Sequence, residues 1–352
     1  MSLLFARALL AVSFVTVPSQ AAPIELGKQF FHKDWAAACD NTLSCEAVSL
    51  MNDSQDDSVP TISLSRASDV AGSVQIKISI AEPKGDRYRL LVDGRQIDSG
   101  ILAKGEYPIR VEGAAAMKLA RAMGRGRKLI IRGADDAVLG QLGLNGTAAA
   151  FTHIDSVQNR ARTPTALFAL GKRAFRAKTA PLPVITARRI GKQDIIPDAG
   201  AIVGLVEASE CVEASSGVTE NSAYSLGRHD GTYQALVMLS CGSGAYNFSS
   251  APFIGTSTNG KKWSFVPARF DYPTDGVQRK DSVNLLVNSS WDAEKQQISS
   301  YAKGRGIGDC GSAETYVWDG MMFRLVLAYA MDECRGSTDW MTLWRAKVEF
   351  RD

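Results

Sequence analysis

The six cysteines of this chain are suited to three kinds of chemistry. Cysteines form disulfides in an oxidising compartment, act as redox thiols where one is exposed with a lowered pKa, or bind zinc at short spacings. No CxxC pair occurs and no histidine lies at ligand spacing from a cysteine, so no metal site is expected. An even number favours disulfides, although the sequence does not choose among the possible pairings. We expect neighbours to pair: Cys39 with Cys45, Cys211 with Cys241, and Cys310 with Cys334.

A hydrolase would need a nucleophile beside a base, and the chain has three histidines. His229 lies in a polar run over residues 227–231, and Ser243 lies between two glycines after Cys241. Ser243 lacks the spacing of the GxSxG elbow that activates serine in many hydrolases. Acidic pairs such as Asp271 with Asp275 could serve glycoside hydrolysis, which depends on their separation in space. A hydrolase acting on glycan or peptide is therefore an alternative function.

Basic residues are unevenly distributed, although the formal net charge is only +3. Residues 159–193 contain nine lysines or arginines and no acidic residue, and residues 118–132 contain six and no acidic residue. Such runs suit an anionic partner, or they form a solvated basic face. The first run supplies the expected binding residues Arg173, Arg176, Arg188 and Arg189.

Residues 301–311 form an unusual segment in which glycines alternate with other residues. The segment lacks the lysine and the strand-loop-helix context of a phosphate-binding loop, and no other cofactor motif is found. We expect a tight turn that is held by Cys310. Lys303, Arg305 and Asp309 are candidates for a small polar binding site in this turn.

The first residues have the order of a secretory signal: Arg7, an apolar run over residues 8–17, and small residues ending at Ala21 and Ala22. We expect a signal peptide over residues 1–22 and a mature protein in the periplasm or secreted. The apolar run is shorter than the roughly 20 residues that span a bilayer, and no later stretch is long enough. In this setting the anions on offer are lipopolysaccharide phosphates, anionic lipid head groups and acidic glycans, and nucleic acid is not expected as a partner.

The mature length predicts two domains. Pro181, Pro183 and Pro197 lie in a basic stretch without clear periodicity, which predicts a linker over residues 179–200. An N-terminal domain would then cover residues 23–178, and a C-terminal domain residues 201–352. The oligomeric state is left open.

Periodicity predicts a mainly β fold that is stapled by disulfides. The N-terminal domain is expected to be α+β, with helices over residues 114–123 and 147–158 and a hairpin at Asp93-Gly94. Its expected strands are 61–65, 74–80, 88–92, 107–111 and 128–132. The C-terminal domain is expected to be antiparallel β with two disulfides and turns at Asn259-Gly260 and Asp319-Gly320. Its expected strands are 234–240, 264–268, 284–288, 297–301, 315–318, 322–329 and 342–350.

Short motifs in both parts of the chain resemble a known family. The motifs are Lys33-Asp34-Trp35, Cys39-Asp40-Asn41, Cys45, residues 302–311, Val317-Trp318-Asp319-Gly320, Glu333-Cys334-Arg335 and residues 340–346. Through them the mature chain resembles the uncharacterised bacterial six-cysteine family named domain of unknown function 1176. The N-terminal domain, residues 23–178, is also similar to the invasion-associated locus B family of exported proteins, through Asp34-Trp35, Cys39 and the stretch 143–171 around Asp155 and residues 167–170. These resemblances imply an envelope setting, with surface or host interaction, and bring no catalytic residues.

Together these features favour a non-catalytic envelope protein. In this hypothesis a rigid disulfide scaffold presents its loops and a basic strip between the domains to an anionic envelope component or an envelope protein, without a cofactor. The alternatives are the hydrolase and a redox-active thiol protein, which would require free or exposed reactive cysteines.

Overall fold

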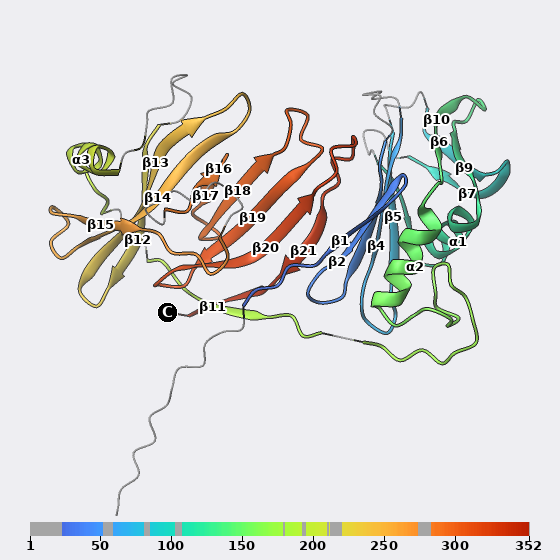
Figure 1. The fold of residues 1–352 in the computed structure, drawn as a ribbon, viewed down its shortest axis with the longest axis horizontal. Helices are drawn as coiled ribbons and strands as arrows, with labels where there is room; N and C mark the ends of the chain where they lie inside the picture. The colour runs from blue at the N-terminus through green and yellow to red at the C-terminus, as the bar shows by residue number, and fades with distance from the viewer. Residues whose placement is uncertain are drawn as a thin grey trace, which may run out of the picture.

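A computed structural model of the chain describes residues 23–51, 59–80, 85–102, 108–178, 180–191, 195–209, 211, 220–273 and 283–351. The expected signal peptide and Asp275 lie outside these residues. The described protein is mostly β, with several antiparallel sheets, three helices and three disulfides, which confirms the expected fold class. Figure 1 shows an N-terminal half, residues 23–178, beside a C-terminal half, residues 180–351.

The N-terminal half is built on a six-stranded antiparallel sheet with the strand order β1-β2-β3-β4-β5-β8. Successive side chains of a strand point to opposite sides, which gives the sheet two different faces. In β4, Ile62 and Leu64 are buried on the inner face, whereas Ser63 and Ser65 lie half-buried on the outer face. The strands are β1 (Gln29–His32), β2 (Trp35–Cys39), β3 (Cys45–Ser49), β4 (Thr61–Arg66), β5 (Val74–Ser79) and β8 (Ile109–Glu112).

A four-stranded sheet and two helices share one hydrophobic core with the inner face of the six-stranded sheet. Both expected helices are present, as α1 (Gly113–Arg125) and α2 (Thr147–Val157). The smaller sheet has the order β10-β9-β6-β7, with β6 (Arg87–Val92), β7 (Arg95–Ile101), β9 (Lys128–Arg132) and β10 (Val138–Gly143). The expected hairpin joins β6 to β7, and its positive φ values, 47° at Asp93 and 82° at Gly94, suit a tight turn.

The C-terminal half contains two antiparallel sheets whose facing side chains form a second core. Leu236 and Ile254 of one sheet belong to the same buried cluster as Trp318 and Phe323 of the other. One sheet comprises β12 (Ser222–His229), β13 (Thr232–Ser243), β14 (Phe248–Ser257), β15 (Ser264–Pro267) and β16 (Leu286–Val287). The other comprises β17 (Ser290–Asp292), β18 (Gln297–Lys303), β19 (Gly311–Trp318), β20 (Phe323–Met331) and β21 (Met341–Arg345).

Helix α3 (Ala199–Ser209) packs through Leu205 on a cluster that includes Val237 and Phe253. This helix was not predicted from the sequence, and its Gly200 and Gly204 lower the intrinsic helix propensity of the segment.

Two features differ from the expected path of the chain. The single strand expected over residues 342–350 is wrong, because β21 leaves its sheet after Arg345 and β22 (Lys347–Arg351) continues in another. β22 pairs in parallel with β11 (Val184–Arg188), a strand inside the stretch that was expected to be a linker. Lys347 N–H also donates to the Pro183 carbonyl (2.8 Å), so this stretch lies along the C-terminal half. The division of the chain into domains at residues 179–200 stays a prediction.

Candidate functional site

The two halves meet at a joint, which we define as the contact between the outer face of β2 and β3 and the segment 331–345. Ala36, Ala38 and Val48 lie in one buried cluster with Met341 and Leu343. Figure 1 shows β21 next to the six-stranded sheet at the middle of the molecule. The joint is therefore a hydrophobic core in its own right, not a loose contact between two bodies.

Polar groups surround this cluster and join motifs that lie far apart in sequence. Arg335 donates to the Asp34 carboxylate (2.8 Å) and to the Met51 carbonyl (3.1 Å). Arg345 forms an ion pair with Asp40, and its backbone exchanges two hydrogen bonds with the Asn41 side chain (2.8 and 3.0 Å). The motif residues of the two halves thus hold the joint together, a structural role that explains their types without any catalysis.

Glu46 of β3 completes the joint. Its carboxylate oxygens accept hydrogen bonds from Thr342, one from the backbone N–H (2.8 Å) and one from the hydroxyl (3.1 Å). Burial raises the pKa of Glu46 above its ordinary value, while the Thr342 hydrogen bonds and the charge of Arg345 act in the opposite direction. A carboxylate engaged in this way positions β21 and is poorly placed to transfer protons to a ligand.

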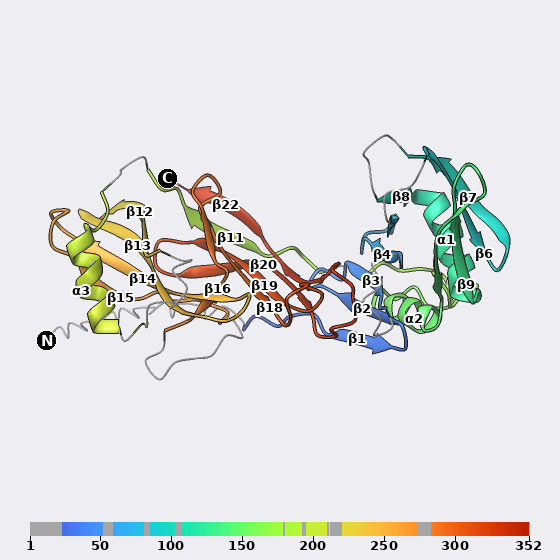
Figure 2. The same ribbon diagram turned by 90° about the horizontal axis from the view of Figure 1, so that it is seen from above.

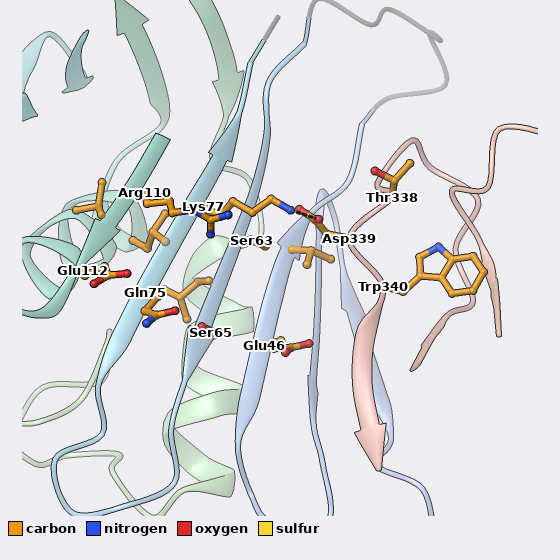
Figure 3. A pocket seen from close by; sticks show the side chains of 14 residues that line it. Glu46, Ser63, Ser65, Gln75, Lys77, Arg110, Glu112, Thr338, Asp339 and Trp340 are labelled. Atoms are coloured by element: carbon orange, nitrogen blue, oxygen red, sulfur yellow. Dashed lines mark hydrogen bonds and ion pairs between the residues drawn. The ribbon is translucent and has the colours of Figure 1, made fainter. Parts of the chain in front are cut away.

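A polar cleft of about 390 Å³ lies beside the joint, where the outer face of the six-stranded sheet is not covered (Figure 3). Its floor consists of two rows of cross-strand neighbours, Ser63, Lys77 and Arg110 in one row and Ser65, Gln75 and Glu112 in the other. Asp339 forms its wall and pairs with Lys77 across the cleft (2.5 Å).

The two glutamates of this cleft are not placed as the carboxylate pair of a glycosidase. Glu46 and Glu112 lie on the same face but three strands apart, so their Cα atoms are about 14 Å apart at the usual strand spacing. Glycosidases place their two carboxyl groups roughly 5–9.5 Å apart. The cleft therefore offers hydrogen-bonding groups for a polar ligand, and its third carboxylate, Asp339, is paired with Lys77.

A second hollow, which we call the basic groove, lies between α1 and the hairpin of β6 and β7. Figure 2 shows these elements at the far end of the N-terminal half. Its volume is about 660 Å³. Apolar side chains line it: Val92, Ile97, Ala114, Met117 and Ala122. Four cationic side chains surround them: Arg95, Lys118, Arg121 and Arg125.

The basic run over residues 118–132 was the only sequence signal for this groove, and it supplied three of the four cations. Arg95 comes from β7, and only the pairing of β7 with β6 brings it near α1. Arg95 was therefore not predicted as a binding residue.

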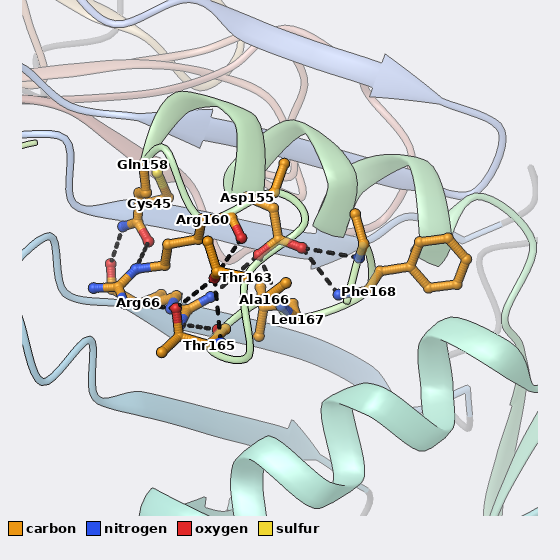
Figure 4. Close-up of polar contacts among 12 residues, drawn as sticks. Cys45, Arg66, Asp155, Gln158, Arg160, Thr163, Thr165, Ala166, Leu167 and Phe168 are labelled. Atoms are coloured by element: carbon orange, nitrogen blue, oxygen red, sulfur yellow. Dashed lines mark hydrogen bonds and ion pairs between the residues drawn. The ribbon is translucent and has the colours of Figure 1, made fainter. Parts of the chain in front are cut away.

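A buried polar network holds the loop that follows α2 (Figure 4). The Asp155 carboxylate is fully buried, pairs with Arg66 (3.3 Å), and accepts backbone hydrogen bonds from Leu167 (2.8 Å) and Phe168 (3.0 Å). Burial lowers the pKa of Arg66 to about 10, and the nearby charge of Arg160 acts in the same direction. The Asp155 carboxylate and the Arg66 guanidinium are thus buried and bind other groups of the protein, which indicates a structural role for this network.

The turn at residues 301–311 brings two of its three expected site residues together. Arg305 forms an ion pair with Asp309, whose carboxylate is fully buried and also accepts from Gly336 N–H (2.6 Å). Hydrogen bonding from Arg305 keeps the pKa of Asp309 below its ordinary value. Lys303 lies instead over the ring of Tyr301, at 5.8 Å. Asp309 thus organises the turn from within.

The four arginines of the expected basic strip lie in two places. Arg173 donates to the carbonyls of Asn159 (2.6 Å) and Ala161 (3.0 Å), and Arg176 lies nearby, with its own carbonyl accepting from the Asn159 side chain (3.1 Å). These contacts belong to the N-terminal half.

The other two arginines belong to the C-terminal half. Arg188 of β11 donates to the Arg228 carbonyl (2.9 Å), and the guanidinium of Arg189 lies over the ring of Phe350, at 5.3 Å. Lys192, from the same basic run, lies outside the described residues. The side chains of Arg173, Arg188 and Arg189 are thus engaged locally, in two separate places, whereas the printed contact of Arg176 is through its backbone carbonyl.

The structure does not bring together the candidate nucleophile and base of a hydrolase. His229 pairs with Thr232 at the start of β13, whereas Ser243 ends the same strand. Eleven residue steps along a strand correspond to about 35 Å.

All six cysteines are paired, in the three bridges between neighbours that we expected. A redox function based on a free thiol therefore has no candidate residue. Among the residues that the structure describes, no group of three His, Cys, Asp or Glu side chains is arranged to hold a metal ion. No helix in the same residues is both long and apolar enough to cross a membrane.

Comparison with known proteins gives the family of the chain. A family described as "Protein of unknown function (DUF1176)" matches residues 29–347. The chain is similar to the "Uncharacterized protein YpfG" of Escherichia coli (strain K12), with 25% identity over 367 residues that cover 97% of each chain. No solved structure matches. The match over residues 29–347, with motifs that meet at the joint, shows that this protein belongs to the DUF1176 family.

Proposed function

We propose that this protein is a non-catalytic binding protein of the bacterial envelope and that it binds an anionic envelope component at the basic groove. The observation that carries the proposal is the charge of the groove. None of its four cationic side chains, Arg95, Lys118, Arg121 and Arg125, forms an ion pair with another residue that the structure describes.

The acidic residue in the lining of the groove is already engaged. The Asp93 carboxylate accepts backbone hydrogen bonds from Arg127 (3.1 Å) and Lys128 (3.0 Å), which tie the hairpin to the start of β9. The single negative charge of Asp93 neutralises only part of the positive charge of the four cationic side chains of the groove. Cationic surfaces of this kind raise the local concentration of anions and bind them in a salt-dependent way.

The envelope setting has separate support. Three disulfides are typical of proteins that fold outside the reducing cytosol, and the sequence of residues 1–22 has the order of a secretory signal. In the envelope, phosphate and carboxylate groups of lipids and glycans are the abundant anions, and the four cations suit them.

Vesicle binding tests the proposal. The probe is a set of vesicles with and without anionic phospholipid, used at low and high salt. We expect the native protein to sediment with the anionic vesicles at low salt, and K118E/R125E to bind at least about ten-fold more weakly, because the field of the groove is reversed at two of four positions. K261E/K262E is the matched control, since it changes the net charge equally on an exposed loop of the C-terminal half.

The same assay separates the groove from the basic strip. If R188E/R189E loses binding while K118E/R125E keeps it, the anion binds along β11 and the groove proposal is wrong. If no variant and no salt concentration changes sedimentation, binding is not electrostatic and the proposal fails.

A further inference from the structure

The apolar floor of the basic groove indicates which class of anionic ligand it binds, an inference that rests on the proposed function. We propose that the ligand is an anionic amphiphile, with a hydrocarbon chain lying on the apolar floor and an anionic head group among the four cations. A polyanionic glycan would use the cations and leave the floor without a partner.

The floor is apolar and adaptable. Val92 is almost completely buried at the base, and Ile97 and Met117 are half-buried beside it. Methionine has a flexible, polarizable side chain that adapts to chains of different shape. A hollow of about 660 Å³ lies within the usual range of small-molecule sites, which are mostly apolar with a few polar groups that orient the ligand.

Small residues keep the groove open. Ala114 and Ala122 line it from α1, where larger side chains would fill the space. Gly126 lies where the helix ends against the hairpin, and a Cβ atom there would come within 2.2 Å of the Val92 side chain. Gly126 N–H also donates to the Ala122 carbonyl (2.8 Å), which closes the last turn of α1 beside Val92.

The cations are arranged on both sides of this floor. Lys118, Arg121 and Arg125 follow one another at spacings of three and four residues, which places them along one face of α1. Arg95 lies across the groove on the exposed start of β7. The guanidinium of Arg121 donates to the carbonyls of Pro164 (2.7 Å) and Ala166 (3.1 Å), so at least one cation is held in place by the protein.

Calorimetry with three soluble probes tests the inference: dodecyl phosphate below its micelle concentration, glycerol phosphate, and dodecyl maltoside. We expect dodecyl phosphate to bind the native protein and glycerol phosphate to bind far more weakly. Removal of two methylene groups from the chain should weaken binding about ten-fold, which corresponds to two buried CH₂ groups. The uncharged maltoside should bind more weakly than the phosphate with the same chain.

Two variants separate the chain from the head group. Ala114 is exposed and lines the groove, so A114W should obstruct the floor without disturbing the core, and it should weaken dodecyl phosphate while leaving glycerol phosphate unchanged. M117Q is a second variant with the same expected result, and thermal unfolding checks that both proteins are folded. R125E should weaken both phosphates.

The outcomes distinguish this inference from the proposed function. If glycerol phosphate binds as tightly as dodecyl phosphate and A114W has no effect, the amphiphile is wrong and the anion-binding function stands. If dodecyl maltoside binds as tightly as dodecyl phosphate, the groove does not select anions, and the proposed function fails with the inference. If no probe binds and K118E/R125E still sediments with anionic vesicles, both proposals are overturned.

Discussion

Asp155 shows how one side chain can order a whole loop. Its carboxylate meets a buried arginine on one side and accepts three backbone N–H groups, those of Leu167, Phe168 and Ala169, on the other. Two buried arginines, Arg66 and Arg160, lie in the same network, so Asp155 supplies a negative charge that this interior needs. Removing one partner of a buried ion pair is far more costly than removing an exposed one.

We therefore predict that D155N destabilises the protein by about 3–5 kcal/mol, because it leaves Arg66 as an unpaired buried charge and turns one acceptor into a donor. Urea unfolding followed by circular dichroism measures the change. D136N is the matched control: Asp136 pairs with Arg89, but its side chain is 65% exposed, so the cost should be only about 0–1 kcal/mol. Equal losses for the two variants would show that the network is not a buried ionic one.

At the scale of elements, the outer face of the six-stranded sheet has two parts, one that forms the joint and one that forms the floor of the polar cleft. β2 and β3 contribute alanines and a valine to the joint, whereas β4, β5 and β8 contribute polar side chains to the cleft. The pair of Glu46 with Thr342 connects β3 to β21 at the boundary between these two parts.

The raised pKa of Glu46 predicts how the stability of the protein depends on pH. Its pKa is raised by burial, so the native state binds this proton more tightly than the unfolded state, and the contribution of Glu46 to stability falls as the pH rises through the raised pKa. E46Q keeps an acceptor for Thr342 N–H and a donor for its hydroxyl, without the buried charge. We expect the melting temperature of E46Q to equal or exceed that of the native protein at pH 8, with a smaller difference at pH 4. A native protein that is more stable than E46Q at pH 8 would contradict this account.

The sequence predicted elements whose signal is local. Residues 114–123 carry a helical period that matches α1, and Asp93-Gly94 adopts the positive φ values that its residue types favour. β2, with the sequence Trp-Ala-Ala-Ala-Cys, was missed because it is buried on both faces and shows no alternation. β11 and β22 were missed as partners because a parallel pair between segments so far apart leaves no local pattern. The basic groove was predictable only in part. Its cations on α1 belong to one basic run in the sequence, whereas Arg95 lies outside that run.

At the scale of the whole molecule, the chain passes between the two halves more than once. Ile24 and Leu26 precede β1 but pack in the core of the C-terminal half, and Gly27 N–H donates to the Leu343 carbonyl (2.9 Å). β11 then returns the chain to β22, the last strand. Two separate cores joined by a third buried cluster should therefore unfold as one cooperative unit.

The joint is the place to test this cooperativity. We predict one transition in calorimetry for the native protein and two for R335A/R345A, because this variant removes the ion pairs with Asp34 and Asp40 that connect the two halves. R324A is the matched control, since Arg324 pairs with Asp319 inside the C-terminal half (2.6 Å) and its loss should lower stability while keeping one transition. A native protein that already shows two transitions would mean that the joint holds the halves in contact without coupling their unfolding. In that case the family motifs at the joint would set only the relative position of the halves. A ligand that binds in the basic groove would then stabilise the N-terminal half alone.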